Sequence, residues 1–162
     1  MKRRSAVAAF AALALAGCVV EQGATKSAQP TLGEQCKPTS EQEIAALFDR
    51  WNQSLQTGDP HQVAANYADE SILLATVSDK PRLTMAEKED YFQHFLADRP
   101  SGKIDMRRVY LGCNSAVDAG LYTFTFAKTG AVVHARYTYS YRWDGARWLI
   151  TSHHSSAMPG KP

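Results

Sequence analysis

Hydrophobic residues recur at helical spacing directly after residue 40, where the pattern of ordered structure begins in this 162-residue chain. The spacing predicts an amphipathic helix whose apolar side carries Ile44, Leu47, Phe48, Trp51 and Leu55. The helix opens with the capping-box pattern Ser40-x-x-Glu43, and Gly58 is typical of a helix end.

Two further helices are predicted downstream. Asp59, which is followed by proline, is a typical N-cap for a short helix with Tyr67 on its apolar side. A second capping box, Thr84-x-x-Glu87, opens a longer helix that continues to about residue 96. A short strand is predicted between these helices, at residues 71–77.

The rest of the chain alternates between apolar and polar residues, which is the pattern of half-buried β-strands. Turn sequences at 129–130 and 144–145 indicate hairpins. The pattern predicts four strands, at about 103–111, 115–127, 131–143 and 147–154. Helices followed by antiparallel strands define an α+β fold, with three N-terminal helices packed on one face of a curved antiparallel sheet.

The first 38 residues have a different composition. Residues 2–4 are basic, and residues 5–14 form an apolar run that is too short to span a bilayer but fits a secretory signal. The run ends in Leu15-Ala16-Gly17-Cys18, which resembles the lipobox of bacterial lipoproteins; ordinary cleavage after Ala16 is the alternative. The predicted organisation is a lipoprotein-type signal peptide at 1–17, a flexible tether at 18–38 and a folded domain at 39–160.

Lipidation of Cys18 predicts a protein on the periplasmic side of the cell envelope, and Val19 after the lipobox favours the outer membrane by analogy. It also leaves Cys36 and Cys113 as a candidate disulfide pair in an oxidising compartment. Such a bond closes a loop of about 78 residues and stabilises the fold by roughly 4 kcal/mol in the chain-entropy model. Two unpaired thiols are the alternative.

Net charge argues against a nucleic-acid partner. The formal charge is +2, but removal of Lys2, Arg3 and Arg4 with the signal leaves 15 basic and 16 acidic residues. No run of basic residues survives in the mature chain, whereas nucleic-acid binding depends on clustered Lys and Arg. The membrane is therefore expected to be reached through the lipid anchor alone.

Three stretches carry a resemblance to a known family. They are the helix and turn from Phe48-Asp49-Arg50-Trp51-Asn52 to Gly58-Asp59-Pro60, the segment from Ala135-Arg136-Tyr137-Thr138 to Arg142-Trp143-Asp144-Gly145, and the ending from Trp148 to Pro159. Over residues 40–159 the chain resembles bacterial relatives of the calcium/calmodulin-dependent protein kinase II association domain, the SgcJ/EcaC-type proteins of the nuclear transport factor 2-like (SnoaL-like) superfamily. The resemblance implies a cone-shaped fold, a pocket between sheet and helices, and dimers or rings formed through the sheet. It implies no single chemistry, because superfamily members include isomerases, cyclases, dehydratases and assembly modules.

The strand at 132–143 has one aromatic and one polar face, because alternate residues point to opposite sides. In one interpretation the aromatic face is core and the polar face is exposed to water. In the other, the polar face lines the pocket, and the aromatic face is a homodimer surface formed by Tyr137, Tyr139, Tyr141 and Trp148.

The resemblance directs attention to a ligand pocket. In the kinase association domain the pocket is lined by basic residues, and the corresponding positions here are near Tyr122, Thr138 and Ser155, none of which is basic. Arg136 is the candidate for a displaced positive charge, which would suit a small carboxylate or other oxyanion. The predicted ligand-binding residues are Tyr67, Tyr122, His134, Arg136, Thr138, His153 and Ser155.

No catalytic constellation is evident. His134 and His153 are candidate general bases, with Tyr67 or Tyr122 as a donor. A metal site is not expected, because His153 and His154 are adjacent strand residues that point to opposite faces, and no cofactor motif is present. Three hypotheses remain: a small-molecule-binding or assembly domain, an enzyme of the cyclase, isomerase or dehydratase kind, and a scaffold that binds no ligand.

Overall fold

The computed structural model of the protein describes residues 35–76 and 78–160. The predicted signal peptide, the lipobox with Cys18 and most of the predicted tether lie outside the described residues. Within them, three α-helices and five strands form one compact unit that begins at Gln35. The α+β fold class predicted from the sequence is confirmed.

The helices begin where the sequence predicts. The first is α1 (Glu41–Gln56), which Ser40 caps by accepting a hydrogen bond from the Glu43 backbone at 3.2 Å. The short α2 (Pro60–Ala64) is capped by Asp59. At α3 (Met85–Phe95) the capping box is reciprocal, with the Thr84 side chain and the Glu87 side chain each accepting from the other's backbone. A 3-10 turn, Leu96–Asp98, follows α3.

One sheet contains all five strands in the order β1-β5-β4-β3-β2. The strands are β1 (Tyr67–Leu74), β2 (Pro100–Gly112), β3 (Ser115–Phe126), β4 (Val132–Trp143) and β5 (Trp148–Ala157). Neighbouring strands are antiparallel except β1 and β5, which are parallel. The strand predicted at 71–77 starts earlier, so Tyr67 belongs to β1 and not to the second helix.

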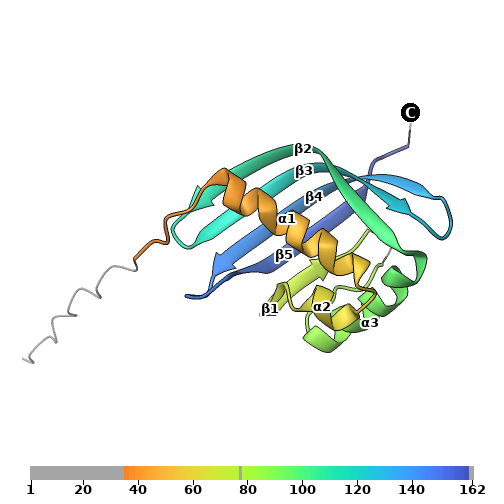
Figure 1. The fold of residues 1–162 in the computed structure, drawn as a ribbon, viewed down its shortest axis with the longest axis horizontal. Helices are drawn as coiled ribbons and strands as arrows, with labels where there is room; N and C mark the ends of the chain where they lie inside the picture. Colours follow the sequence, from red (N-terminus) through yellow and green to blue (C-terminus); the bar gives the residue numbers. More distant parts are fainter. Residues whose placement is uncertain (1–34, 77, 161–162) are drawn as a thin grey trace, which may run out of the picture. The chain divides into compact units, whose positions relative to one another are not determined.

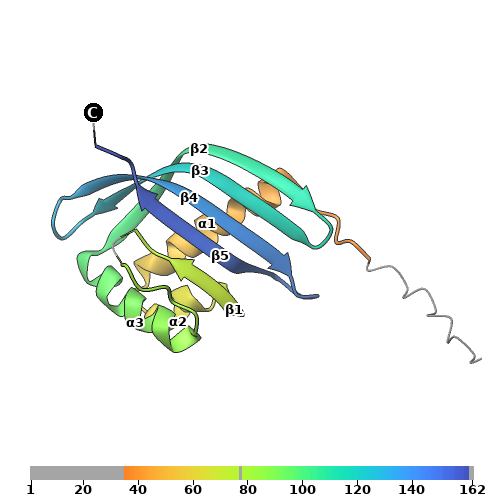
Figure 2. The same ribbon diagram turned by 180° about the vertical axis from the view of Figure 1, so that it is seen from behind.

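The helices cover one face of the sheet and leave the other face without a helix. Figure 1 shows α1 crossing in front of the sheet, with α2 and α3 near one end, and Figure 2 shows the opposite face of the sheet turned to the viewer. We call the covered side the inner face. Its aromatic residues pack against α1: Trp51 lies 5.9 Å from Tyr139 and Phe48 lies 6.5 Å from Tyr137, between ring centroids.

This packing corrects one prediction. The residues proposed as a homodimer surface are at most 3 % exposed within a single chain, namely Tyr137, Tyr139, Tyr141 and Trp148. They form the core because an amphipathic helix of the same chain supplies the apolar partner that a second copy was expected to supply. The aromatic face is therefore core, and the polar face of β4 is the outer one.

Two β-bulges decide which residues share the inner face. Thr151 is an extra residue in β5, since Ser140 pairs with Ser152 but Tyr141 pairs with Ile150. The bulge brings His153 to the same face as Trp148, although an uninterrupted strand would place residues 148 and 153 on opposite faces. The second bulge, at Asp105 in β2, brings the Met106 carbonyl against Gly120, where an added Cβ would lie 1.9 Å from the carbonyl oxygen.

A disulfide joins Cys36 to Cys113, as predicted. It fastens the start of the domain to the hairpin between β2 and β3. Hydrogen bonds support the same attachment: the Lys37 backbone donates to the Asn114 side chain at 2.8 Å, and that side chain donates to the Gln35 carbonyl at 3.3 Å. The segment before α1 is thus fixed covalently as well as by hydrogen bonds.

Candidate functional site

A cavity of about 440 Å³ opens between the inner face of the sheet, α3 and the connection from β1 to α3. Its volume is within the usual range of small-molecule sites. Most of the lining is apolar and much of it aromatic, and it includes Trp51, Leu73, Tyr91, Phe92, Phe95, Phe124, Phe126, Val133 and Ala135. We call these residues the walls, and they favour a ligand with an apolar body.

Four polar residues line the cavity from the strand side, and we call them the floor: Thr76, Tyr122, His153 and Ser155. The Tyr122 hydroxyl donates to the Ser155 hydroxyl, which is also hydrogen-bonded to Thr76. Burial raises the pKa of Tyr122, so its hydroxyl stays protonated. The floor therefore offers hydroxyl groups and an imidazole, and no charged side chain.

His153 is the most constrained floor residue. Its side chain stacks on Tyr139 at 4.1 Å and meets the edge of Trp51 at 5.5 Å, between ring centroids. Only 4 % of His153 is exposed. Burial, with a smaller contribution from His154, lowers its pKa to about 3, so the imidazole is neutral at physiological pH.

The hydrogen bonds of His153 define what it presents to a ligand. Its Nδ1 lies 2.8 Å from the Tyr67 hydroxyl, while its Nε2 is buried and has no partner among the described residues. Because the Tyr67 hydroxyl hydrogen has no other acceptor among these residues, we assign Tyr67 as the donor and Nδ1 as the acceptor. The hydrogen is then on Nε2, so this cavity-lining residue holds an N–H donor that the described residues leave without an acceptor.

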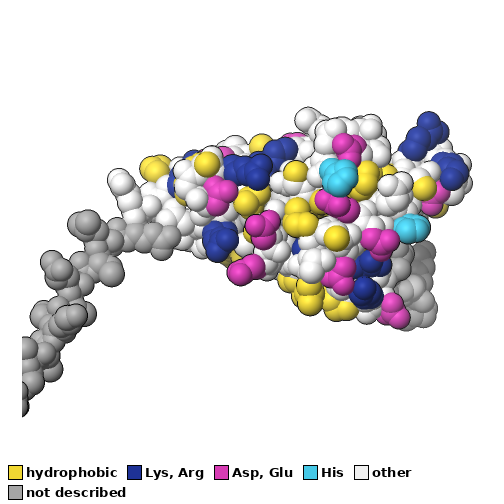
Figure 3. Space-filling model, turned by 90° about the horizontal axis from the view of Figure 1, so that it is seen from below, with side chains coloured by type: hydrophobic (Ala, Val, Ile, Leu, Met, Phe, Trp, Pro, Cys, Tyr) yellow, Lys and Arg dark blue, Asp and Glu magenta, His cyan; other side chains and the backbone are white. Residues whose placement is uncertain are grey.

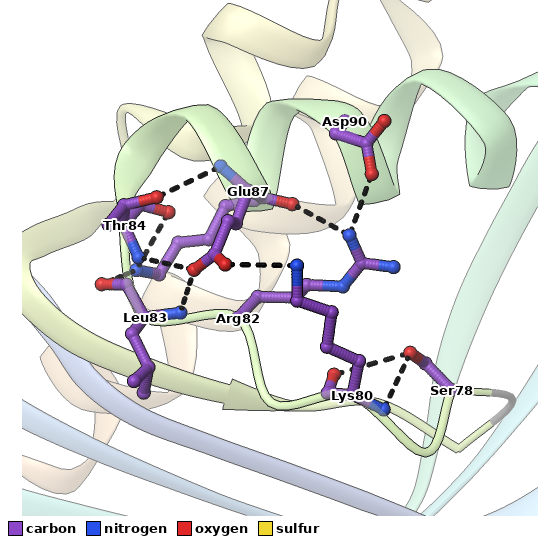
Figure 4. Close-up of polar contacts among 8 residues, drawn as sticks. Ser78, Lys80, Arg82, Leu83, Thr84, Glu87 and Asp90 are labelled. Carbon is purple, nitrogen blue, oxygen red and sulfur yellow. Dashed lines mark hydrogen bonds and ion pairs between the residues drawn. The ribbon is translucent and has the colours of Figure 1, made fainter.

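The partly exposed residues at the cavity opening form its rim, and they are Ser78, Arg82, His94, Asp98 and Thr129. Arg82 is the one lysine or arginine among the described lining residues. Its guanidinium pairs with Asp90 at 2.7 Å, as Figure 4 shows. Arg82 lies in an irregular connection, so hydrophobic periodicity carries no signal for its position.

The connection that carries Arg82 is anchored at several points. Glu87 accepts hydrogen bonds from the backbones of Thr84 and Leu83 and pairs with Lys80 (Figure 4), and the two backbone N–H groups and Lys80 lower its pKa to about 2. The fully buried Lys88 donates to the carbonyls of Ser71 at 2.8 Å and Leu83 at 3.0 Å. These contacts fix the start of α3 against β1.

The structure brings together four of the seven predicted ligand-binding residues. Tyr122, His153 and Ser155 line the cavity, and Tyr67 lies behind His153 as its hydrogen-bond partner. These residues come together because all of them lie on the inner face, where the bulge in β5 places the cavity-lining residues of that strand.

The other three predicted residues do not line the cavity. His134, Arg136 and Thr138 lie on the outer face of β4, where the two basic residues are exposed. Arg136 pairs in register with Ser156 and not with His153 or Ser155, and Thr138 pairs with His154. The error follows from assigning the polar face of β4 to the pocket. His134 and His153 thus share no face, and His134 has no path to the cavity as a general base.

A buried carboxylate that the sequence analysis left unassigned lies away from the cavity. Asp118 is fully buried on the inner face, where it pairs with Arg107 at 3.0 Å and accepts a hydrogen bond from Tyr137 at 2.8 Å. Burial raises the pKa of Asp118, while Tyr137 and Arg107 oppose that rise. None of the three lines the cavity, so we assign this cluster to the core beneath α1.

The described residues show neither a metal-ligand cluster nor a membrane-spanning helix. Residues 35–76 and 78–160 contain no group of three or more His, Cys, Asp or Glu side chains arranged to hold a metal ion. No helix in the same ranges is long and apolar enough to cross a membrane. Figure 3 shows acidic and basic side chains interspersed on the face seen from below.

The fold defines the class of protein first. A nuclear transport factor 2-like protein from Pseudomonas putida aligns over 77% of this chain and 91% of its own, with 19% identity and a TM-score of 0.66. A structure from Streptomyces avermitilis, named as a dehydratase of that family, aligns over 74% and 97%, with 10% identity and a TM-score of 0.61. These identities show the fold alone, which is nuclear transport factor 2-like.

The sequence defines the family within this class. Residues 40–159 match the calcium/calmodulin-dependent protein kinase II association domain. A Xanthomonas campestris structure that bears the name of this domain is 48% identical, covers 76% of this chain and 91% of its own, and has a TM-score of 0.73. The chain therefore belongs to the calcium/calmodulin-dependent protein kinase II association domain family, as its resemblance implied. A comparison with curated proteins finds no match.

Proposed function

We propose that the protein is an exported, lipid-anchored, dimeric domain that binds a small molecule in the cavity above His153. The ligand has an apolar body that fills the walls and an oxygen that accepts a hydrogen bond from His153. The single observation that carries the proposal is a largely apolar cavity lined by His153, a residue whose buried Nε2 has no partner among the described residues. A buried donor without a partner costs about 1–3 kcal/mol, and a ligand oxygen would remove that cost.

The position of Arg136 changes the expected ligand. The sequence predicted a small anion held by Arg136, but this residue lies on the outer face. The floor carries no charge, since His153 is neutral and its neighbours are hydroxyls. A carbonyl or hydroxyl group is therefore the part of the ligand that fits the floor.

The proposal is tested with a neutral, apolar fluorescent probe, N-phenyl-1-naphthylamine. We expect saturable 1:1 binding to the wild-type protein, with energy transfer from Trp51 in the cavity wall. Ala135→Leu adds three carbons to a cavity-lining position and should weaken binding at least tenfold, because the bulkier side chain occupies the space of the probe. Ala119→Leu, on the outer face of β3, is the matched control and should bind the probe normally. Equal binding by both variants would refute the assignment of the cavity.

A second candidate function is catalysis on a carbonyl compound. The observation in its favour is again His153, because a neutral N–H in a dry cavity can polarise a carbonyl oxygen. The low pKa argues against His153 as a general base, and Nδ1 is occupied by Tyr67. Turnover that survives in His153→Gln at the wild-type rate would eliminate this candidate.

Dimerisation is proposed through the outer face of the sheet, in place of the buried aromatic face. Met106 is 48 % exposed, and it pairs in register with Leu121 on the face that no helix covers (Figure 2). Met106→Glu should convert a dimer to a monomer in light scattering. Leu83→Glu, at a 55 % exposed site away from the sheet, should leave the dimer intact. A monomeric wild-type protein would remove this part of the proposal.

Export and anchoring are proposed from the lipobox sequence that ends at Cys18. The bond between Cys36 and Cys113 supports the proposal, because it suits an oxidising compartment and leaves Cys18 as the third cysteine. The expected result is partition of the wild-type protein into the detergent phase of a Triton X-114 extraction. Cys18→Ser should move it to the aqueous phase, and identical partition of the two proteins would contradict the anchor.

A further inference from the structure

The rim residue Arg82 has a guanidinium that its own chain satisfies on one side only. Its Nη1 makes two side-chain hydrogen bonds, to the Asp90 carboxylate at 2.7 Å and to the Glu87 carbonyl at 3.4 Å. Its Nε is buried and has no hydrogen-bond partner among the described residues. Its Nη2 makes no hydrogen bond with these residues and, unlike Nε, is not enclosed, so Nη2 is left for another acceptor.

The backbone holds Arg82 firmly at the cavity. Its N–H donates to the Leu73 carbonyl and its carbonyl accepts from the Leu73 N–H, each at 3.0 Å. Leu73 itself lines the cavity wall. The guanidinium carbon lies 5.7 Å from the centre of the Tyr91 ring, which is also part of the wall. Arg82 is therefore preorganised at the rim, and the Asp90 contact fixes the orientation of its guanidinium.

The free Nη2 has a definite chemical preference. It is a charged donor, and it forms its strongest hydrogen bonds with ionised acceptors such as a carboxylate. The neighbouring charges do not cancel this preference: Asp90 is bound to the guanidinium through Nη1, and Asp98 at the rim has Lys128 as its own counter-ion at 3.7 Å. A neutral ligand group would bind Nη2 more weakly.

We propose that Arg82 is the anion-binding residue of the cavity, and that the ligand is an amphipathic carboxylic acid. Its carboxylate binds Nη2 of Arg82 at the rim, and its apolar body lies between the walls. This inference rests on the proposed function, because it needs the cavity to bind a small molecule. It places the charge of the ligand at the opening of the cavity and leaves the floor for an uncharged group.

The test compares two ligands with the same body, 1-naphthylacetate and 1-naphthylacetamide, as competitors of N-phenyl-1-naphthylamine. The wild-type protein should prefer the acid by about tenfold, since hydrogen bonds to charged groups are stronger than neutral ones. Arg82→Gln should abolish the preference while leaving the affinity for the amide within about twofold. Arg82→Lys keeps the charge but not the planar guanidinium that places Nη2, so it should retain a smaller part of the preference.

Two further variants make the test independent of any folding defect at Arg82. Asp90→Asn keeps Arg82 and removes the carboxylate that competes for it, so the preference for the acid should increase. Arg136→Gln removes a guanidinium from the outer face and should change nothing. If the neutral probe binds but the acid and amide compete equally in the wild type, or Arg82→Gln keeps the preference, this inference fails and the proposed function stands. If the neutral probe does not bind at all, both fail.

Discussion

The stability of the protein should depend on pH through His153. In the folded chain burial lowers the pKa of this imidazole to about 3, against 6.5 for an ordinary histidine. Between these values the unfolded chain binds a proton that the folded chain does not bind. Stability is therefore complete above pH 6.5 and falls as the pH decreases from 6.5 towards 3. The slope within this window is about 1.4 kcal/mol per pH unit.

The assay is urea unfolding at 25 °C at pH 7 and at pH 5, with His153→Gln as the comparison. The free energy of unfolding of the wild-type protein should fall by about 2 kcal/mol more than that of the variant between these pH values. Glutamine does not titrate, and every other group contributes equally to both proteins, so the difference isolates His153. Parallel pH dependence in the two proteins would refute the argument, because it would mean that His153 is protonated as easily in the folded state as in the unfolded one.

Three further perturbations test the framework around the cavity. Replacing Cys36 and Cys113 by serine should lower the free energy of unfolding by roughly 4 kcal/mol, measured by urea unfolding under non-reducing conditions; a loss below 1 kcal/mol would contradict the chain-entropy estimate. Lys88→Met should cost about 2 kcal/mol in the same assay, since it leaves buried carbonyls without their donor, and an unchanged midpoint would speak against that role. Gly120→Ala should cost about 3 kcal/mol because its Cβ would collide with the Met106 carbonyl, and native stability would show that the bulge is not tight.

The fold was largely predictable because the helix-capping residues and the hydrophobic periodicity of the sequence predict the same helices and strands. The serine, aspartate and threonine caps start the three helices at the expected residues. The strand alternation located β3, β4 and β5 to within a few residues. The start of β1 at Tyr67 was missed, because only Ala65 and Asn66 separate it from α2.

The candidate site was predictable only in part. Alternation separates the two faces of β4 correctly, but it does not say which face the helices cover, and the choice of the polar face put Arg136 in the pocket. The bulge at Thr151 switches the residues that follow it in β5 to the opposite face of the sheet from the one that alternation predicts. No residue type in that strand predicts the bulge. Arg82 was missed for a different reason, since its role depends on a backbone bridge to Leu73 in tertiary structure.

The central claim, that a small molecule occupies the cavity above His153, is tested most directly by NMR of the histidine side chains during titration with N-phenyl-1-naphthylamine. The His153 Nε2 resonance should shift in a saturable manner, with one probe molecule bound per chain. The neighbouring His154, exposed on the opposite face of β5, should not shift. A bound probe that leaves His153 unchanged, or that shifts both histidines equally, would contradict the claim.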